Sequence, residues 1–172
     1  MCKTGPKKIH IIGGPGSGKS YLAARLSREL KIKHYDLDDI FWDHRIKGYG
    51  TKFDAISRDE KLATILSGDR WIIEGAYYKW LDQSFQKSDV IILLVPPTWI
   101  RQWRIFVRFL KGSLGLIPSK GENISNFIEL ALWNQKFNND NQIRIENFIE
   151  KYESKIVKCI ELKNSATLLN HT

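Results

Sequence analysis

The chain has 172 residues, of which 42% are hydrophobic and 27% are charged. This length and composition are typical of one globular domain with a real core, and they exclude a disordered or low-complexity chain. The formal net charge of +8 suits anionic ligands such as nucleotides, and also nucleic acid. Because the basic residues are spread along the chain without a long basic run, phosphate chemistry is favoured over a nucleic-acid surface.

The two cysteines, Cys2 and Cys159, lack the spacing of a metal site, and we interpret them as free thiols in a reducing compartment. The polar N-terminus shows no signal-peptide pattern, and the apolar runs are too short to span a membrane. We therefore expect a cytoplasmic protein.

Short apolar runs alternate with helical patterns along the chain, which is typical of an α/β fold with a parallel sheet. The apolar runs predict strands over 8–12, about 33–37, 71–73, 90–95 and 156–162. The helical periodicity predicts helices over 21–30, 53–67, 97–110, 124–137 and 141–152. The glycine-containing stretch 111–123 is interpreted as a loop.

The glycine-rich turn after the first predicted strand, Gly13 to Ser20, fits the pattern G-x-x-x-x-G-K-[ST] without a mismatch. In such a P-loop the backbone N–H groups and the start of the following helix surround phosphates. Lys19 is expected to reach the β- and γ-phosphates, and Ser20 to bind Mg²⁺. The alternative is a glycine-rich turn without a ligand. The predicted nucleotide-binding residues are Gly14, Pro15, Gly16, Ser17, Gly18, Lys19, Ser20 and Tyr21.

An acidic stretch follows the second predicted strand, where Asp36 and Asp38 would share one strand face. A carboxylate here would either hold the metal through water or accept the proton of an acceptor hydroxyl. The alternative is a solvated acidic turn that caps the next helix. Trp42, close behind, is either core packing or the wall of an acceptor pocket.

The third predicted strand ends in Glu74 and Gly75, which resembles a Walker B element. Glu74 would orient a water on Mg²⁺, and Gly75 would let the backbone approach the acceptor. The alternative is a strand-end carboxylate paired with a lysine.

Three arginines follow the fourth predicted strand, and their spacing of three and four residues places Arg101, Arg104 and Arg108 on one helical face. Guanidinium groups match the charge of a transferring phosphoryl group, so this face suits a lid that closes on phosphates. The alternatives are a solvated basic face and a nucleic-acid contact.

Together, the P-loop, the Leu-Asp-Asp-Ile-Phe-Trp stretch at 37–42, the stretch 71–77 and the arginine-rich helix resemble a known group. It is a group of adenylate-kinase-like P-loop proteins, often called "DNA topology modulation protein" or related kinases. The resemblance implies one P-loop kinase-like domain over 1–172, with a lid at approximately 108–144. It also implies a three-layer P-loop NTPase fold, with a five-stranded parallel sheet in the order 2-3-1-4-5 flanked by helices.

The resemblance further implies an ATP-dependent kinase that uses Mg²⁺. It places Asp38 at the acidic position after the second strand, Arg104 and Arg108 as lid arginines, and Lys163 and Asn164 where such kinases pass the adenine base. Together with the motifs, we expect Lys19, Asp38, Arg104 and Arg108 to act in catalysis. We expect Ser20 and Glu74 to hold the metal. The residues expected to bind the acceptor are Asp38, Trp42, Glu74, Gly75 and Tyr77. The chain departs from the group at Ala76, where relatives have Asn, and in the arginine-poor stretch 134–139.

The main hypothesis is an ATP-dependent phosphotransferase that acts on a small molecule or nucleotide, as a monomer or homodimer. The second hypothesis is a nucleotide-binding regulator that acts on DNA or DNA-associated partners, as the group name and the charge of +8 suggest. The chain contains no Asn-Lys-x-Asp motif for guanine, which argues against a GTPase. The identity of the acceptor stays open.

Overall fold

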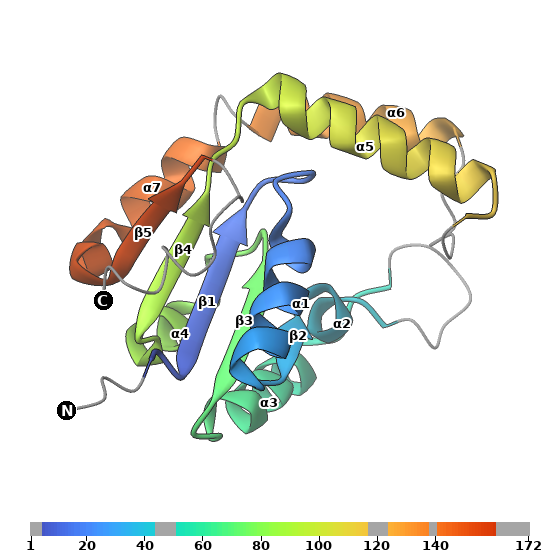
Figure 1. Cartoon of the computed structure of the whole chain (residues 1–172). Helices are drawn as coiled ribbons and strands as arrows, with labels where there is room; N and C mark the ends of the chain where they lie inside the picture. The colour runs from blue at the N-terminus through green and yellow to red at the C-terminus, as the bar shows by residue number, and fades with distance from the viewer. Residues whose placement is uncertain (1–4, 44–50, 117–123, 138–140, 161–172) are drawn as a thin grey trace.

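A computed structural model of the protein contains one five-stranded parallel sheet with helices around it (Figure 1). The structure describes residues 5–43, 51–116, 124–137 and 141–160. The strands run in the order β2-β3-β1-β4-β5, so the predicted fold class and strand order are confirmed. The strands are β1 (Lys8–Gly13), β2 (His34–Asp36), β3 (Trp71–Gly75), β4 (Val90–Leu94) and β5 (Ile156–Cys159).

The central strands are apolar on both sides, and every residue of β3 and β4 is buried. Burial on both faces is the reason why parallel strands appear as continuous apolar runs in a sequence. β1 lies between these two strands, with Ile11 beside Glu74 of β3 and Ile92 of β4. Because the strands are parallel, the segments that follow them meet at the carboxyl edge of the sheet, where ligands bind in such folds.

Helices cover both faces of the sheet and give the fold three layers (Figure 1). On one face, Leu26 of the first helix packs with Ile9 and Ile72 of the sheet. On the other face, Phe85 and Ile145 belong to a second buried cluster. The first face carries α1 (Lys19–Leu30), and the second carries α3 (Ala55–Leu66), α4 (Asp82–Lys87) and α7 (Gln142–Ile149).

Three further helices lie at the carboxyl edge: α2 (Asp38–Phe41), α5 (Thr98–Ser113) and α6 (Ile124–Lys136). α5 and α6 lie side by side beyond the ends of the strands, above the turn that follows β1 (Figure 1). Gln102 Nε2 of α5 donates a hydrogen bond to the carbonyl O of Ala131 in α6 at 3.0 Å. The two helices therefore form one layer over the predicted P-loop, which we call the α5–α6 layer.

The structure differs from the predicted elements at several ends. The second strand, predicted over about 33–37, covers only three residues and gives way to the single turn α2. α5 continues to Ser113, into the predicted loop, and the helix predicted over 141–152 ends at Ile149. A 3₁₀ helix, η2 (Glu150–Lys155), follows it. Parts of the predicted loop and of the last strand lie outside the described residues.

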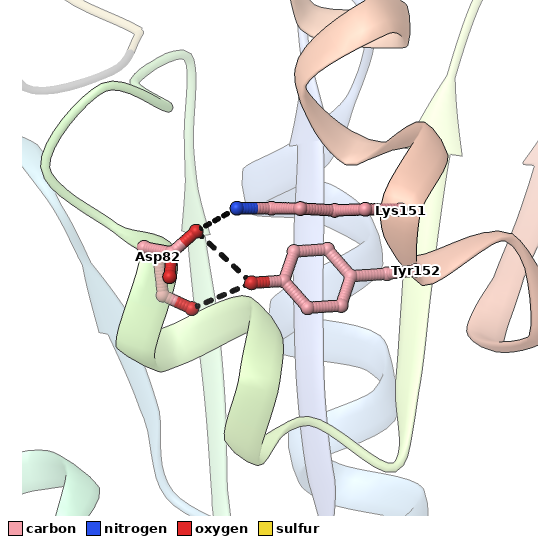
Figure 2. A network of polar contacts seen from close by, with 3 residues as sticks. All are labelled: Asp82, Lys151 and Tyr152. Carbon is pink, nitrogen blue, oxygen red and sulfur yellow. Dashed lines mark hydrogen bonds and ion pairs between the residues drawn. The ribbon is translucent and has the colours of Figure 1, made fainter.

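Two of the described α-helices, the one-turn α2 and the six-residue α4, have no counterpart among the predicted elements. The six residues of α4 are too few to show helical periodicity in the sequence. An exposed contact network joins α4 to η2: Lys151 Nζ pairs with Asp82 Oδ1, which also accepts a hydrogen bond from the Tyr152 hydroxyl at 3.0 Å (Figure 2). This network ties together the helices that cover one face of the sheet.

His10 of β1 is fully buried. Its Nδ1 lies 2.8 Å from the Ser84 hydroxyl, and its ring stacks on Phe85 with 4.2 Å between the centroids. Burial lowers the pKa of His10 to about 3, so the ring is neutral in the folded protein at neutral pH. Cys159 is a buried free thiol. None of the helices in the described part of the chain is long and apolar enough to cross a membrane.

Candidate active site

The P-loop joins the end of β1 to the start of α1. Gly16 and Gly18 have φ values of 68° and 96°, a left-handed backbone that glycine adopts without strain. Ser17 N donates to Gly14 O at 3.3 Å within the turn, and Leu22 N donates to Gly18 O at 3.0 Å at the helix start. These contacts place the turn at the helix N-terminus, where orphan N–H groups and the helix dipole favour an anion.

Lys19, the first residue of α1, folds back over this turn, and its Nζ donates to Gly14 O at 3.0 Å. Burial lowers the pKa of Lys19, while the carboxylates of Glu74, Asp38 and Asp36 raise it. Carboxylates from two segments of the chain, 36–38 and the end of β3, are therefore close enough to act on one ammonium group. Of the other predicted nucleotide-binding residues, Tyr21 is 60% exposed on α1.

Glu74 is buried at the end of β3, beside β1. Burial is the main cause that raises the pKa of Glu74, and the nearby Lys19 and a hydrogen bond from the Ser20 hydroxyl act against it. The structure thus brings together the two residues predicted to hold Mg²⁺. A hydroxyl and a carboxylate are hard oxygen donors, which fit an ion that usually takes only one or two carboxylates besides phosphate oxygens and water. Within the described ranges there is no cluster of three His, Cys, Asp or Glu that would bind a metal by itself.

The predicted placement of Asp36 and Asp38 on one strand face is wrong, because β2 ends at Asp36 and Asp38 is the first residue of α2. The turn between them is closed by a hydrogen bond from Asp38 N to Asp36 Oδ1 at 2.9 Å. This is an Asx-type turn, in which a short carboxylate replaces a backbone acceptor. Asp38 is exposed at the carboxyl edge of the sheet.

Tyr77 orients the Asp38 carboxylate, since its hydroxyl donates to Asp38 Oδ1 at 2.7 Å. Burial and the nearby Asp38 charge raise the pKa of Tyr77, so the hydroxyl stays protonated and remains a donor. Two segments that are far apart in the sequence thus jointly hold one carboxylate.

Half-buried aromatic rings surround this pair. Phe41 stacks on Tyr77 at 4.6 Å between centroids, and Trp80 lies 5.8 Å from Tyr77. Trp42 meets the edge of Phe41 at 5.0 Å and is itself half-buried, so packing explains much of its environment. Gly75 also has a packing reason, because a Cβ there would lie 2.7 Å from Leu37 Cδ1.

The three predicted arginines of α5 have different environments. Arg104 Nη1 donates to the carbonyls of Ser17 at 2.8 Å and Gly16 at 3.4 Å, which clamps α5 onto the P-loop. Arg101 is only 2% exposed and lies against Gly14. Arg108 is exposed.

Arg101, Asn134 and Phe137 also lie near the P-loop. Arg101 was predicted only as part of the arginine face that it shares with Arg104. Asn134 and Phe137 had no predicted role, and only the packing of α6 brings them to the loop. Lys163 and Asn164, predicted to pass the adenine base, lie outside the described residues.

Comparison with known proteins places the chain in a family. No protein-family model matches it. The chain is 34% identical over 131 residues to the uncharacterized protein YqaC of Bacillus subtilis (strain 168), which covers 73% of this chain and 71% of the relative. The chain belongs to the YqaC family.

Solved structures of kinases share the fold of this YqaC-family protein. A gluconokinase from Sinorhizobium meliloti 1021 aligns with a TM-score of 0.56 at 14% identity, over 98% of this chain and 90% of that chain. A shikimate kinase from Bacteroides thetaiotaomicron aligns with a TM-score of 0.52 at 14% identity, over 96% and 94% of the respective chains. A sugar kinase from Janibacter sp. HTCC2649 gives 0.53 at 14% identity, over 94% and 89%. These likenesses show a P-loop kinase fold, while the narrower resemblance to the topology-modulation group stays a prediction.

Proposed function

We propose that this YqaC-family protein is an ATP-dependent phosphotransferase that moves the γ-phosphoryl group of ATP to a small-molecule acceptor. The observation that carries the proposal is the convergence on Lys19. The carboxylates of Glu74, Asp38 and Asp36 all act on this residue, which itself folds over the P-loop. A triphosphate site next to an exposed, oriented carboxylate is the arrangement that phosphoryl transfer to a hydroxyl requires.

In the proposed reaction, the P-loop binds the phosphates of ATP. Its backbone N–H groups and Lys19 hold the β- and γ-phosphates, and Arg104 fixes α5 against the loop through Ser17 and Gly16. Ser20 would hold Mg²⁺ directly and Glu74 would hold it through a water. The ion supplies positive charge that neutralises the phosphate oxygens during transfer.

In the proposed reaction, Asp38 acts on the acceptor. Its exposed carboxylate, held by Tyr77, would accept the proton from the acceptor hydroxyl as the oxygen attacks phosphorus. The half-buried rings of Phe41, Trp42 and Tyr77 line the approach to Asp38 and suit an acceptor with a flat or apolar part. The presence of this fold in a gluconokinase, a shikimate kinase and a sugar kinase supports a small acceptor.

We further propose a lid at approximately 108–144 of a single kinase domain, which includes the end of α5 and all of α6. Closure of such a lid excludes water, which would otherwise compete with the acceptor for the phosphoryl group. Arg108, which is exposed in the structure, would reach the transferring group only on closure.

A coupled assay of ADP formation, with ATP–Mg²⁺ and a panel of nucleosides, nucleotides and sugars, tests the proposal. We expect at least one acceptor to raise ADP formation well above the slow hydrolysis of ATP alone. The Lys19→Ala protein, prepared in parallel, should give no such increase, which excludes a contaminating kinase. Binding of ATP–Mg²⁺ without transfer to any acceptor would contradict the kinase assignment. Salt-sensitive DNA binding that responds to ATP would then favour the regulator instead.

A further inference from the structure

Two polar side chains outside the predicted catalytic set are buried beside the start of the P-loop. Arg101 of α5 is 2% exposed, and Asn134 of α6 is 0% exposed. Burial of a carboxamide without a hydrogen-bond partner costs stability, so the position of Asn134 beside the P-loop calls for a functional reason.

Arg101 lies directly against the P-loop. A Cβ on Gly14 would lie 2.1 Å from Arg101 Nη1, so the guanidinium packs against the Gly14 backbone. The group lies over the Phe137 ring, 5.6 Å from its centroid, and its Nη2 approaches the carbonyl O of Asn134 at 3.4 Å. Arg101 thus connects α5, α6 and the P-loop.

The position of Lys19 tells which end of a triphosphate lies here. In this motif the lysine reaches the β- and γ-phosphates, and Lys19 Nζ lies 3.0 Å from Gly14 O. Two cations, Lys19 and Arg101, therefore flank the same glycine. A terminal phosphate beside both cations would be attracted to each of them and would offset their mutual repulsion.

Asn134 gives a second argument for a ligand beside the start of the P-loop. Neither its Nδ2 nor its Oδ1 has a hydrogen-bond partner among the described residues, although the side chain is fully buried. Ala131, one turn before it, contacts α5, and Phe137, one turn after it, would lie 2.9 Å from a Cβ on Gly14. Residues three apart share a helical face, so Asn134 belongs to the face of α6 that meets α5 and the P-loop.

We propose that Arg101 and Asn134 bind the terminal phosphate of the nucleoside triphosphate, so that the α5–α6 layer distinguishes ATP from ADP. This inference rests on nucleotide binding at the P-loop, as in the proposed function, but it does not depend on phosphoryl transfer. It explains why a carboxamide without a partner stays in a buried position, since the ligand would satisfy it.

Asn134→Leu is the first test, because the leucine side chain has the same number and branching of heavy atoms and needs no partner. We expect the ligand-free variant to unfold at a temperature equal to or above that of the wild type, since an unsatisfied buried amide is removed. The rise in melting temperature caused by ATP–Mg²⁺ should shrink. A variant that melts lower without ligand and keeps the full ATP-induced rise would show that Asn134 is structural, and would overturn its role.

Arg101→Met is the second test, since methionine keeps the apolar contact with Phe137 and removes the charge. Titration with fluorescent analogues of ATP and ADP should show about tenfold or greater weakening for ATP and a much smaller change for ADP. Lys111→Met, an exposed residue on the same helix, is the matched control and should change neither affinity. Arg101→Lys, which keeps the charge, provides a folded comparison if the methionine variant is unstable.

The outcomes separate this inference from the proposed function. Equal weakening for ATP and ADP in the arginine variants would overturn the assignment to the terminal phosphate, and leave nucleotide binding intact. If the wild-type protein bound neither nucleotide, both the inference and the proposed function would fail. If ATP bound in the predicted way without any phosphoryl transfer, only the kinase proposal would fail.

Discussion

The two sides of the candidate site differ in how their polar groups are satisfied. On the acceptor side, Asp36 holds the backbone of Asp38, and Tyr77 holds its carboxylate. On the side of the α5–α6 layer, the buried Ser17 hydroxyl and the Asn134 carboxamide have no hydrogen-bond partner within the described residues.

Under the proposed function, this difference predicts which half of the site is ordered before a ligand binds. On the proposed acceptor side, the Asp38 carboxylate is already oriented, so its orientation adds no free-energy cost at the moment of reaction. The layer side carries buried polar groups without a partner among the described residues, so under the proposal nucleotide binding should stabilise it most. The predictions below test this contrast, from the largest expected effect on catalysis to none.

Lys19→Ala should abolish the activity of both sides, because Lys19 contacts the P-loop and also lies within the field of Glu74, Asp38 and Asp36. We expect ATP affinity to fall roughly 10- to 100-fold and transfer to be lost. Isothermal titration with ATP–Mg²⁺ and the ADP assay measure the two effects. Retention of wild-type affinity would show that the turn is not a phosphate site.

Asp38→Asn should affect only the acceptor side. The amide cannot accept a proton, so we expect kcat to fall by about 10²–10⁴, while ATP affinity stays near that of the wild type. The neighbouring variant Asp39→Asn is the matched control and should keep most of the activity. Full activity of Asp38→Asn would remove Asp38 from the role of base.

Tyr77→Phe measures how much the orientation of that carboxylate contributes. The ring and its stacking on Phe41 remain, and only the hydrogen bond to Asp38 Oδ1 is lost. We expect kcat to fall about five- to tenfold with ATP affinity unchanged. Tyr78→Phe, on the next residue, should have no such effect on kcat. A loss in Tyr77→Phe as large as that in Asp38→Asn would mean that Tyr77 itself touches the reacting groups.

His10 lies outside both sides of the candidate site, and it should affect the stability of the fold without affecting catalysis. Its pKa is about 3 in the folded protein against 6.5 in the unfolded chain, so the unfolded state takes up the proton first as the pH falls. The contribution of the neutral ring is complete above pH 6.5 and is lost progressively towards pH 3. At pH 5 the free energy of unfolding should be lower by about 2 kcal/mol.

Urea unfolding between pH 7.5 and pH 4.5 measures this dependence. Asn in place of His10 should flatten it, while Ser84→Ala, which keeps the imidazole, should keep the slope. A His10→Asn protein with the wild-type slope would assign the acid sensitivity to other groups.

The strands and the P-loop could be predicted from local sequence because each depends on local chemistry. A continuous Val, Ile and Leu run such as 90–95 allows few structures other than a strand buried on both faces. The spacing of Gly, Lys and Ser in the P-loop is itself the geometric requirement for holding phosphate. The parallel order then brings the ends of β1, β2 and β3 to one edge, which is why Lys19, Asp38 and Glu74 were predicted together.

The errors arose where a structure depends on contacts with distant residues. Asp36 and Asp38 were expected on one strand face, but β2 ends at Asp36, since the carbonyl O of Leu37 accepts a hydrogen bond from Phe41 N and α2 begins. Arg101 and Arg108 look equivalent in the sequence, yet one is buried at Gly14 and the other is exposed. Which arginine meets the loop depends on how α5 rotates and where α6 packs.

The sequence by itself determined that this protein has a P-loop, a parallel sheet and a carboxylate after each of two strands. Those features follow from hydrophobic periodicity and from residue types that phosphate and magnesium require. Only the tertiary structure decided that Tyr77 orients Asp38, that Arg101 rather than Arg108 lies against Gly14, and that Asn134 is buried without a described partner. These facts depend on packing between segments far apart in the chain, where distance and burial, and not residue type, set the role of a side chain.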